Sequence, residues 1–263
     1  MKKYIFTNFK ILILLAFVSN FLIACTSTRE AVYFYNQPEG VYDNLVPATL
    51  QVINSNDILS ITVSSLNPEA TLIFNNPTSN TGSTGSGSFT QSTGYLIDQE
   101  GFIQFPVLGK IKVAGLTKME LTEFLRKTLV DKQLLLDPVV AVRYLNFRIT
   151  VLGEVSRPMV VAVPNEKISL LEAIGMAGDL TIYARRDNIL LIREEKGKRM
   201  MKRLNLNSGD IFNSQYYYLK SNDIVYVEPN RSKIFSASNT RVILPIVFSA
   251  LSVVAIVIDR VTR

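Results

Sequence analysis

The sequence has no histidine and only one cysteine, and these absences limit its chemistry. Histidine is the commonest general base and the commonest zinc ligand, so the usual acid–base and zinc sites are excluded. Two carboxylate pairs remain, but Asp98 with Glu100 flanks a turn, and Glu194 with Glu195 opens a charged hairpin. No glycine-rich phosphate loop leads from a strand into a helix. We therefore predict a protein that is not an enzyme and that uses no metal or cofactor.

The positive charge is small once an N-terminal signal is set aside. The formal net charge is +6, and residues 1–24 hold three lysines and no acid, which leaves +3. Acidic residues are interspersed with the basic ones, so we expect no nucleic-acid partner. The remaining length allows one large domain or two small domains, each with a core.

The N-terminus has the pattern of a secretory signal. Lys2, Lys3 and Lys10 precede apolar runs at 11–18 and 21–24, which favours a signal peptide over residues 1–24. A retained anchor helix is the alternative. The tetrapeptide that ends at Cys25 resembles a bacterial lipobox, whose cysteine carries diacylglycerol. Cys25 cannot form an internal disulfide, and lipidation would explain an unpaired thiol in an exported protein. We predict lipidation of Cys25, followed by a tether and irregular segment over 25–47.

Three further segments are informative. Two of them allow two interpretations each, and the third predicts a flexible loop. The aromatic residues 33–35 are expected to pack on a domain rather than form a sugar-stacking platform, because adjacent side chains of an extended chain point to opposite faces. For Arg185 and Arg186, a solvated surface is favoured over contact with an acidic glycan. Residues 75–94 are almost entirely Gly, Ser, Thr and Asn, which predicts a flexible loop within a domain.

The rest of the chain predicts several strands around one helix, twice. Strands are expected at 50–53 and 58–63 around a turn, in a hairpin about 100–101, and at 138–145 and 147–155. Strands at 188–194 and 223–229, with a hairpin at 197–209, form the second set. The helices begin at capping boxes, Thr117 with Glu120 and Ser169 with Glu172, and Gly178 ends the second helix. The buried face predicted for the first helix is Leu121, Phe124, Leu125 and Leu129.

These segments resemble a known family. Residues 54–63, 95–129 and 137–142 resemble the polysaccharide export domain of Wza-type outer-membrane auxiliary proteins, and 149–194 are similar to the SLBB module, a β-grasp-like unit. The resemblance implies an α+β fold with an export domain over 48–147 and an SLBB domain over 148–230. Three positions depart from the family at turns, Asn56, Met159 and Asp179, where glycine is usual. They put the local conformation in doubt rather than the fold.

The C-terminal segment 241–260 has no charged side chain between Arg241 and Asp259. We predict a transmembrane helix, although residues 242–258 would span only about 25 Å against a bilayer core of about 30 Å. A buried core helix is the alternative. Ser249 and Ser252 lie three residues apart and form a weak polar stripe. They are candidate pore-lining residues if the helix does more than anchor the chain.

The resemblance implies a function in transport. Members of the family are outer-membrane lipoproteins with a periplasmic body, and they assemble into homo-oligomeric rings that conduct capsular or extracellular polysaccharide. The expected partners are outer-membrane lipid, the polysaccharide and an inner-membrane copolymerase. A periplasmic lipoprotein that binds a ligand or glycan without forming a pore is the alternative. An envelope enzyme is disfavoured by the missing histidines.

Overall fold

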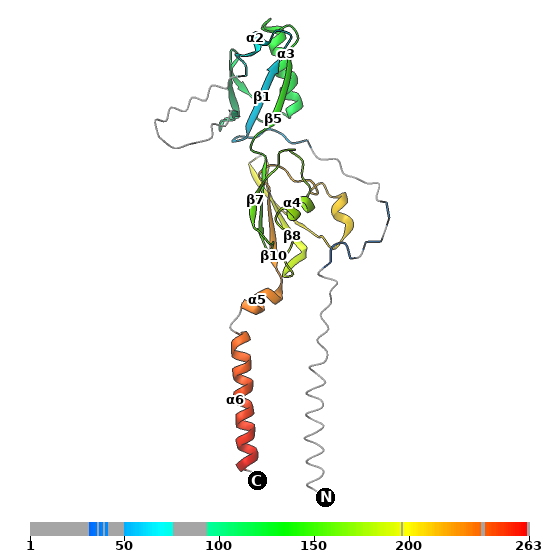
Figure 1. The fold of residues 1–263 in the computed structure, drawn as a ribbon, viewed down its shortest axis with the longest axis vertical. Helices are drawn as coiled ribbons and strands as arrows, with labels where there is room; N and C mark the ends of the chain where they lie inside the picture. Colours follow the sequence, from blue (N-terminus) through cyan, green and yellow to red (C-terminus); the bar gives the residue numbers. More distant parts are fainter. Residues whose placement is uncertain are drawn as a thin grey trace, which may run out of the picture.

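The computed structural model describes residues 32–35, 37–38, 40–41, 50–75, 94–195, 197–237 and 240–261. The predicted signal peptide, Cys25 and most of the predicted loop 75–94 lie outside these residues. Two units that each carry a sheet follow one another along the molecule, with helices α5 and α6 beyond the second (Figure 1). We call residues 50–145 the first unit and residues 146–229 the second unit.

The first unit is built on an antiparallel three-stranded sheet with the order β2-β1-β5. Its elements are β1 (Ile58–Ser64), α2 (Pro68–Thr71), β2 (Tyr95–Leu96), β3 (Phe102–Phe105), β4 (Gly109–Lys112), α3 (Lys118–Asp131) and β5 (Val139–Tyr144). Strands β3 and β4 form a separate hairpin, and α3 packs on β5. The largest fully buried side chains of this unit are Ile53, Leu59, Ile97, Ile103, Phe105, Leu121, Leu125 and Leu129.

Helix α3 begins where its sequence predicts. The Thr117 side chain accepts a hydrogen bond from the Glu120 N–H, and the Glu120 carboxylate accepts one from the Thr117 N–H, so the predicted capping box is present. Leu121, Leu125 and Leu129 are fully buried, whereas Phe124 is 46% exposed and its predicted burial is wrong. Because α3 packs chiefly on one strand, a narrow stripe spaced by four residues suffices to cover it.

Two predicted features of the first unit, the strand at 50–53 and the hairpin about 100–101, differ in the structure. Residues 50–53 form no regular strand, and only Val52 makes a bridge, to Thr117. A turn does occur at 98–101, where the Gly101 N–H donates to the Asp98 carbonyl. The hairpin predicted there is displaced, however, because β2 pairs with β1 and the true hairpin joins β3 to β4. Local alternation identifies extended segments but not their partners.

The second unit is a five-stranded sheet with the order β7-β6-β10-β8-β9. Its elements are β6 (Arg148–Gly153), β7 (Met159–Ala162), α4 (Leu170–Met176), β8 (Ala184–Glu195), β9 (Lys198–Leu204), the 3-10 helix η2 (Gly209–Asn213) and β10 (Ile224–Pro229). Strands β6 and β10 are parallel, and the other pairs are antiparallel. The predicted capping box of Ser169 with Glu172 starts α4, and Gly178 follows its end with a φ of 80°.

Strand β6 runs unusually close to β10 at Gly153. A Cβ atom built there would lie 2.0 Å from the Val227 carbonyl oxygen, and the glycine has a φ of 91°. Only glycine fits both the contact and the conformation.

Two of the three departures from the family keep a glycine-like backbone. Asn56 has a φ of 68° and Asp179 a φ of 72°. Asn and Asp are the non-glycine residues that enter this left-handed region most readily. Met159, in contrast, begins the extended strand β7. The turns at 56 and 179 therefore retain the conformation that glycine would adopt.

The predicted transmembrane helix at 241–260 is wrong. Two helices end the chain, α5 (Arg231–Ala237) and α6 (Thr240–Val261), and within the described ranges no helix combines the length and the apolarity needed to cross a bilayer. The physical reason is the length of the uncharged stretch, which spans about 25 Å against a hydrocarbon core of about 30 Å. A buried core helix is also wrong, because Leu244, Phe248 and Leu251 of α6 are each about half exposed.

Candidate functional site at the junction of the two units

The two units meet around a cavity of about 220 Å³, which we call the junction cavity. The first unit contributes the segment before β1, the start of α3 and the end of β5. The second unit contributes the turn after β7 and the segment before β10. The polar and aromatic residues that line it include Gln51, Lys118, Tyr144, Phe147, Glu166, Lys167, Tyr218 and Lys220.

A single carboxylate joins the two units at the edge of this cavity. Glu166 lies in a turn with a φ of 55°, and its side chain is only 11% exposed. One carboxylate oxygen accepts a hydrogen bond of 2.7 Å from the Tyr144 N–H, and the other forms an ion pair with Lys118 at the start of α3. Both oxygens of the partly buried carboxylate thus have partners, which offsets much of its desolvation cost.

A second bridge connects the segment before β1 to the segment before β10. The Ser221 N–H donates to the side-chain oxygen of Gln51 at 3.1 Å. Residue 51 is held in turn on the first unit, because the Ile53 N–H donates to the Leu116 carbonyl at 2.8 Å.

The Asn146 side chain, beside the covalent connection between β5 and β6, also accepts from the Ile58 N–H and donates to the Asn56 carbonyl of the first unit. The Glu166 and Gln51 bridges therefore add to contacts that already flank the connection.

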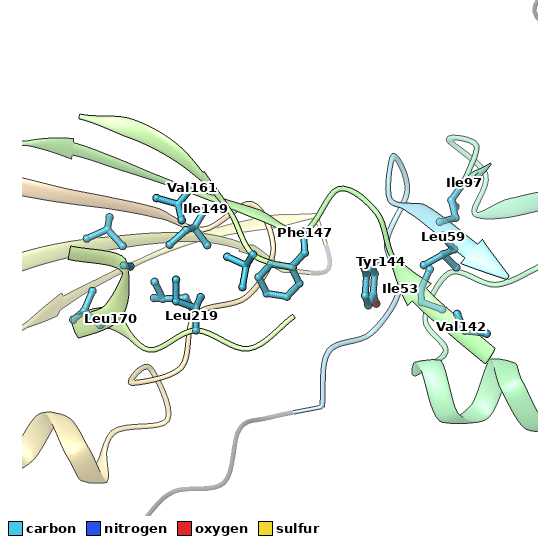
Figure 2. Close-up of a cluster of buried hydrophobic side chains, with 14 of the residues drawn as sticks. Ile53, Leu59, Ile97, Val142, Tyr144, Phe147, Ile149, Val161, Leu170 and Leu219 are labelled. Carbon is cyan, nitrogen blue, oxygen red and sulfur yellow. The ribbon is translucent and has the colours of Figure 1, made fainter. Parts of the chain in front are cut away.

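Two aromatic rings fill the space between the units. Tyr144 and Phe147 pack edge to face, with ring centroids 6.4 Å apart and planes at 83°, and Figure 2 shows them facing each other across the junction. Tyr144 is only 7% exposed. Burial raises the pKa of Tyr144 above its ordinary value, and the carboxylates of Asp57 and Glu166 raise this pKa further. The site therefore keeps this hydroxyl protonated and uncharged.

The carboxylate pairs considered from the sequence serve in surface ion pairs. Lys110 lies 3.7 Å from Asp98 and 2.7 Å from Glu100. The Phe102 N–H also donates to Asp98, and this hydrogen bond, with the Lys110 charge, lowers the pKa of the Asp98 carboxyl. Both carboxylates are engaged by Lys110 at the surface, so the pair stabilises a turn.

The second pair is likewise engaged at the β8–β9 hairpin. Glu194 lies 3.8 Å from Arg199, and Glu195 lies 3.0 Å from Lys220. These contacts hold the hairpin and the segment that precedes β10.

The aromatic segment packs on the second unit, as predicted. The ring of Phe34 lies 4.9 Å from that of Phe212, and the Phe34 N–H donates to the Leu206 carbonyl. The Tyr33 hydroxyl donates to Asp179. The solvated surface predicted for Arg186 is wrong, because Arg186 is 7% exposed and lies 5.5 Å from the Tyr33 ring. Arg185 remains partly exposed and pairs with Glu228 and Asp187.

The remaining candidate residues are not part of the junction. The hydroxyls of Ser249 and Ser252 donate to the carbonyls of Ile246 and Ser249 in α6. Their pore-lining role stays a prediction that these contacts do not test. Cys25 lies outside the described residues. The bridging residues Glu166 and Gln51 were missed from the sequence, because nothing local distinguishes a turn glutamate that reaches another domain.

The two units match two known domain families. Residues 47–145 match the polysaccharide biosynthesis/export protein family, and residues 148–204 match the SLBB domain. These are the two domains, in the order, that the resemblance to Wza-type polysaccharide export proteins implied, so the resemblance is confirmed. The match to a family of export proteins rather than to an enzyme family bears out the prediction that the chain is not an enzyme.

Two relatives carry more specific names. The chain is 31% identical over 223 residues to the EPS I polysaccharide export outer membrane protein EpsA of Ralstonia nicotianae. The aligned region covers 81% of this chain and 57% of that protein. It is 33% identical over 199 residues to EpsA of Ralstonia solanacearum, which covers 73% of this chain and 51% of that protein. The chain thus spans about half the length of these curated relatives. The names of both relatives place those proteins at the outer membrane, which is the location predicted for this chain.

Proposed function

We propose that the chain is a component of an outer-membrane apparatus for export of extracellular polysaccharide, in which copies form a periplasmic ring and conduit. The observation that carries this proposal is the succession of an export domain and an SLBB domain in one chain. Two EpsA proteins align with the chain over 223 and 199 residues. A conduit acts through shape and weak contacts, so it requires no catalytic group.

Two features of the fold support a repeated assembly. The second unit presents β7 and β9 as the edges of its sheet, and edge strands offer unpaired backbone groups to a neighbour. Contacts between different faces of identical copies generate closed rings when the rotation closes. The Glu166 and Gln51 bridges at the junction restrain the relative orientation of the two units in each copy, as a regular wall requires.

Membrane attachment and partners belong to the same proposal. Lipid on Cys25 would tether the chain to the outer membrane, because a diacylglycerol carries two acyl chains and two chains give stable anchoring. Assembly into a ring would strengthen the attachment further, because it multiplies the anchors. An inner-membrane copolymerase is the partner expected to deliver the polymer.

The test is genetic and physical. A strain lacking the gene should secrete no polysaccharide, and the full chain supplied on a plasmid should restore secretion. Detergent-extracted protein should show one oligomeric mass by mass photometry. Normal secretion without the gene would overturn the export role, and a monomeric mass would overturn the ring.

The junction cavity gives weight to one alternative, a periplasmic glycan-binding lipoprotein that forms no conduit. This alternative predicts a monomer that binds sugar, in a strain whose secretion does not depend on it. The same two measurements therefore separate the two functions.

A further inference from the structure

The N-terminal aromatic segment is seated on the second unit through backbone and ring contacts. We call residues 33–35 and 37 the strap, and Figure 1 shows this part of the chain beside the second unit, before the chain enters the first unit. The Phe34 N–H donates to the Leu206 carbonyl at 3.0 Å, and the Phe34 ring lies 4.9 Å from the ring of Phe212. Residues from distant parts of the sequence therefore share one packed surface.

Gln37 of the strap occupies space that a glycine leaves open. The Gly209 N–H donates to the Gln37 side-chain oxygen at 2.9 Å, and a Cβ atom built on Gly209 would lie 2.3 Å from the Gln37 carboxamide. The Gln37 N–H donates in turn to the Phe34 carbonyl at 2.9 Å, which closes a turn within the strap. A side chain at position 209 would therefore displace Gln37.

Phe34 has a backbone conformation that its contacts with the second unit impose. Its φ is 53°, and bulky residues rarely adopt a positive φ. Such strain persists only where the surrounding structure determines the conformation. Release of the strap from the second unit would remove this strain.

The strap also covers a buried cation that has poor partners. Arg186 is 7% exposed, and its two hydrogen bonds, to the carbonyls of Ala184 and Thr181, are each 3.5 Å long. Its Nε atom has no hydrogen-bond partner within the described part of the chain. The Tyr33 ring, 5.5 Å away, offers a cation–π contact, but water solvates a charge better than a buried site does. Strain and desolvation thus oppose docking of the strap, whereas its ring contacts and hydrogen bonds favour it.

The strap lies between the predicted lipid and the body of the protein. Tyr33 follows Cys25 by eight positions, and Leu50, where the first unit begins, follows it by 25. A chain reaches at most about 3.5 Å per residue, so a docked strap keeps the second unit within about 28 Å of the lipid, whereas a free strap allows about 88 Å between the lipid and the first unit. Docking of a few residues thus changes the reach of the anchor about threefold.

We propose that the strap is a displaceable latch. When docked, it holds the second unit close to the membrane, and when released, it lets both units move away from the membrane. The inference rests on the lipid at Cys25, which belongs to the proposed function. A conduit must meet the membrane that it serves, and the docked strap favours that position.

Hydrogen exchange at Gly209 tests displacement of the strap, because the N–H of this residue donates to Gln37. In the lipidated full chain, mass spectrometry should show this amide exchanging at least about tenfold faster than amides of the buried strand β8, through local opening. Phe34→Asn removes the ring but keeps a residue that tolerates a positive φ, and it should accelerate the Gly209 exchange about tenfold further. Val41→Ser, at a nearby residue that is 90% exposed, should leave this exchange unchanged. Exchange of Gly209 at the rate of β8 would overturn the inference.

Energy transfer tests the position of the second unit. Cys25 is the only cysteine of the chain and carries the lipid, so a dye on Asn213→Cys, at an exposed residue of η2, is attached at a single free thiol. In vesicles of phosphatidylethanolamine and phosphatidylglycerol, the dye should transfer energy efficiently to acceptor-labelled headgroups. Phe34→Asn and Gly209→Ala should both lower the transfer about twofold or more, because the tether lengthens. Val41→Ser should leave it unchanged.

The two variants act from opposite sides of the contact, so agreement between them excludes a local effect of either substitution. Equal transfer in wild type and both variants, in samples whose Gly209 exchange differs, would overturn the latch. Absence of palmitate on Cys25 would reject it as well, because the tether would then hold no lipid. Secretion reports on the proposed function separately: restored secretion with unchanged transfer rejects the latch alone, whereas secretion that does not depend on the gene rejects the export role and leaves the latch standing.

Discussion

The Glu166 bridge predicts that replacement of one carboxylate loosens the contact between the two units. Glu166→Gln keeps the shape and an acceptor for the Tyr144 N–H but loses the charge that pairs with Lys118. The Lys118 side chain is 39% exposed, so water compensates much of the lost attraction, and the ion pair contributes only about 0.2–1 kcal/mol. The hydrogen bond weakens as well, because a charged acceptor adds roughly 1 kcal/mol over a neutral one.

We therefore expect Glu166→Gln to lower the free energy of unfolding by about 1–2 kcal/mol, and Glu166→Ala by about 2–4 kcal/mol, since alanine also leaves the Tyr144 N–H without this acceptor. Urea denaturation of the full chain in detergent, followed by circular dichroism, measures both. Glu123→Gln is the matched control, because Glu123 forms an exposed ion pair with Arg126 on α3. It should have no measurable effect.

A double-mutant cycle with Lys118→Gln tests the cause. If the two residues interact as the structure places them, their effects should fall short of additivity by about 0.5–1 kcal/mol. Additivity within about 0.3 kcal/mol would refute the reasoning, because residues without a shared interaction behave in that way. A loss equal to that of the Glu123→Gln control would also refute it.

Four further predictions follow from other parts of the chain. Cys25→Ser should abolish labelling by radioactive palmitate, and equal labelling of mutant and wild type would contradict lipidation at this site. Leu125→Ala should cost about 2–5 kcal/mol in urea denaturation, whereas Phe124→Ala on the exposed face should cost far less. Asn56→Ala should lower stability by about 1–2 kcal/mol and Asn56→Gly should not, because alanine is strained at a φ of 68°; equal melting temperatures would contradict this. Burial raises the pKa of Tyr95 from 10.0 to about 12, so the folded chain retains a proton that the unfolded chain releases, and stability should fall as pH rises from about 10 to about 12, less steeply in Tyr95→Phe.

Features set by neighbouring residues were predictable from the sequence. Both capping boxes join residues three positions apart, and the glycine after α4 ends its helix, so each signal is contained in one turn of chain. The order of domains followed from the resemblance. These features depend on bonds that form whatever the rest of the molecule does.

Features that depend on remote partners were missed. Arg186 is buried because Tyr33, far away in sequence, covers it, and no local pattern predicts such a contact. Residues 50–53 alternate as a strand does, but they form only an isolated bridge, between Val52 and Thr117, instead of joining a sheet. The membrane span at 241–260 was predicted although its uncharged stretch falls short of a bilayer core, and no helix in the described ranges is long and apolar enough to span one.

The bridges at the junction have a mechanical consequence. Two bodies joined by one strand of chain can swing and twist about it, whereas added side-chain bridges beside that strand restrain both motions. In a closed ring every copy repeats the same angle between its upper and lower bodies, so an error in that angle would recur at every contact around the circumference. In such a ring the first units would form one layer and the second units another. The Glu166 and Gln51 bridges would keep the two layers aligned, so that a rotation of one layer would turn the other with it.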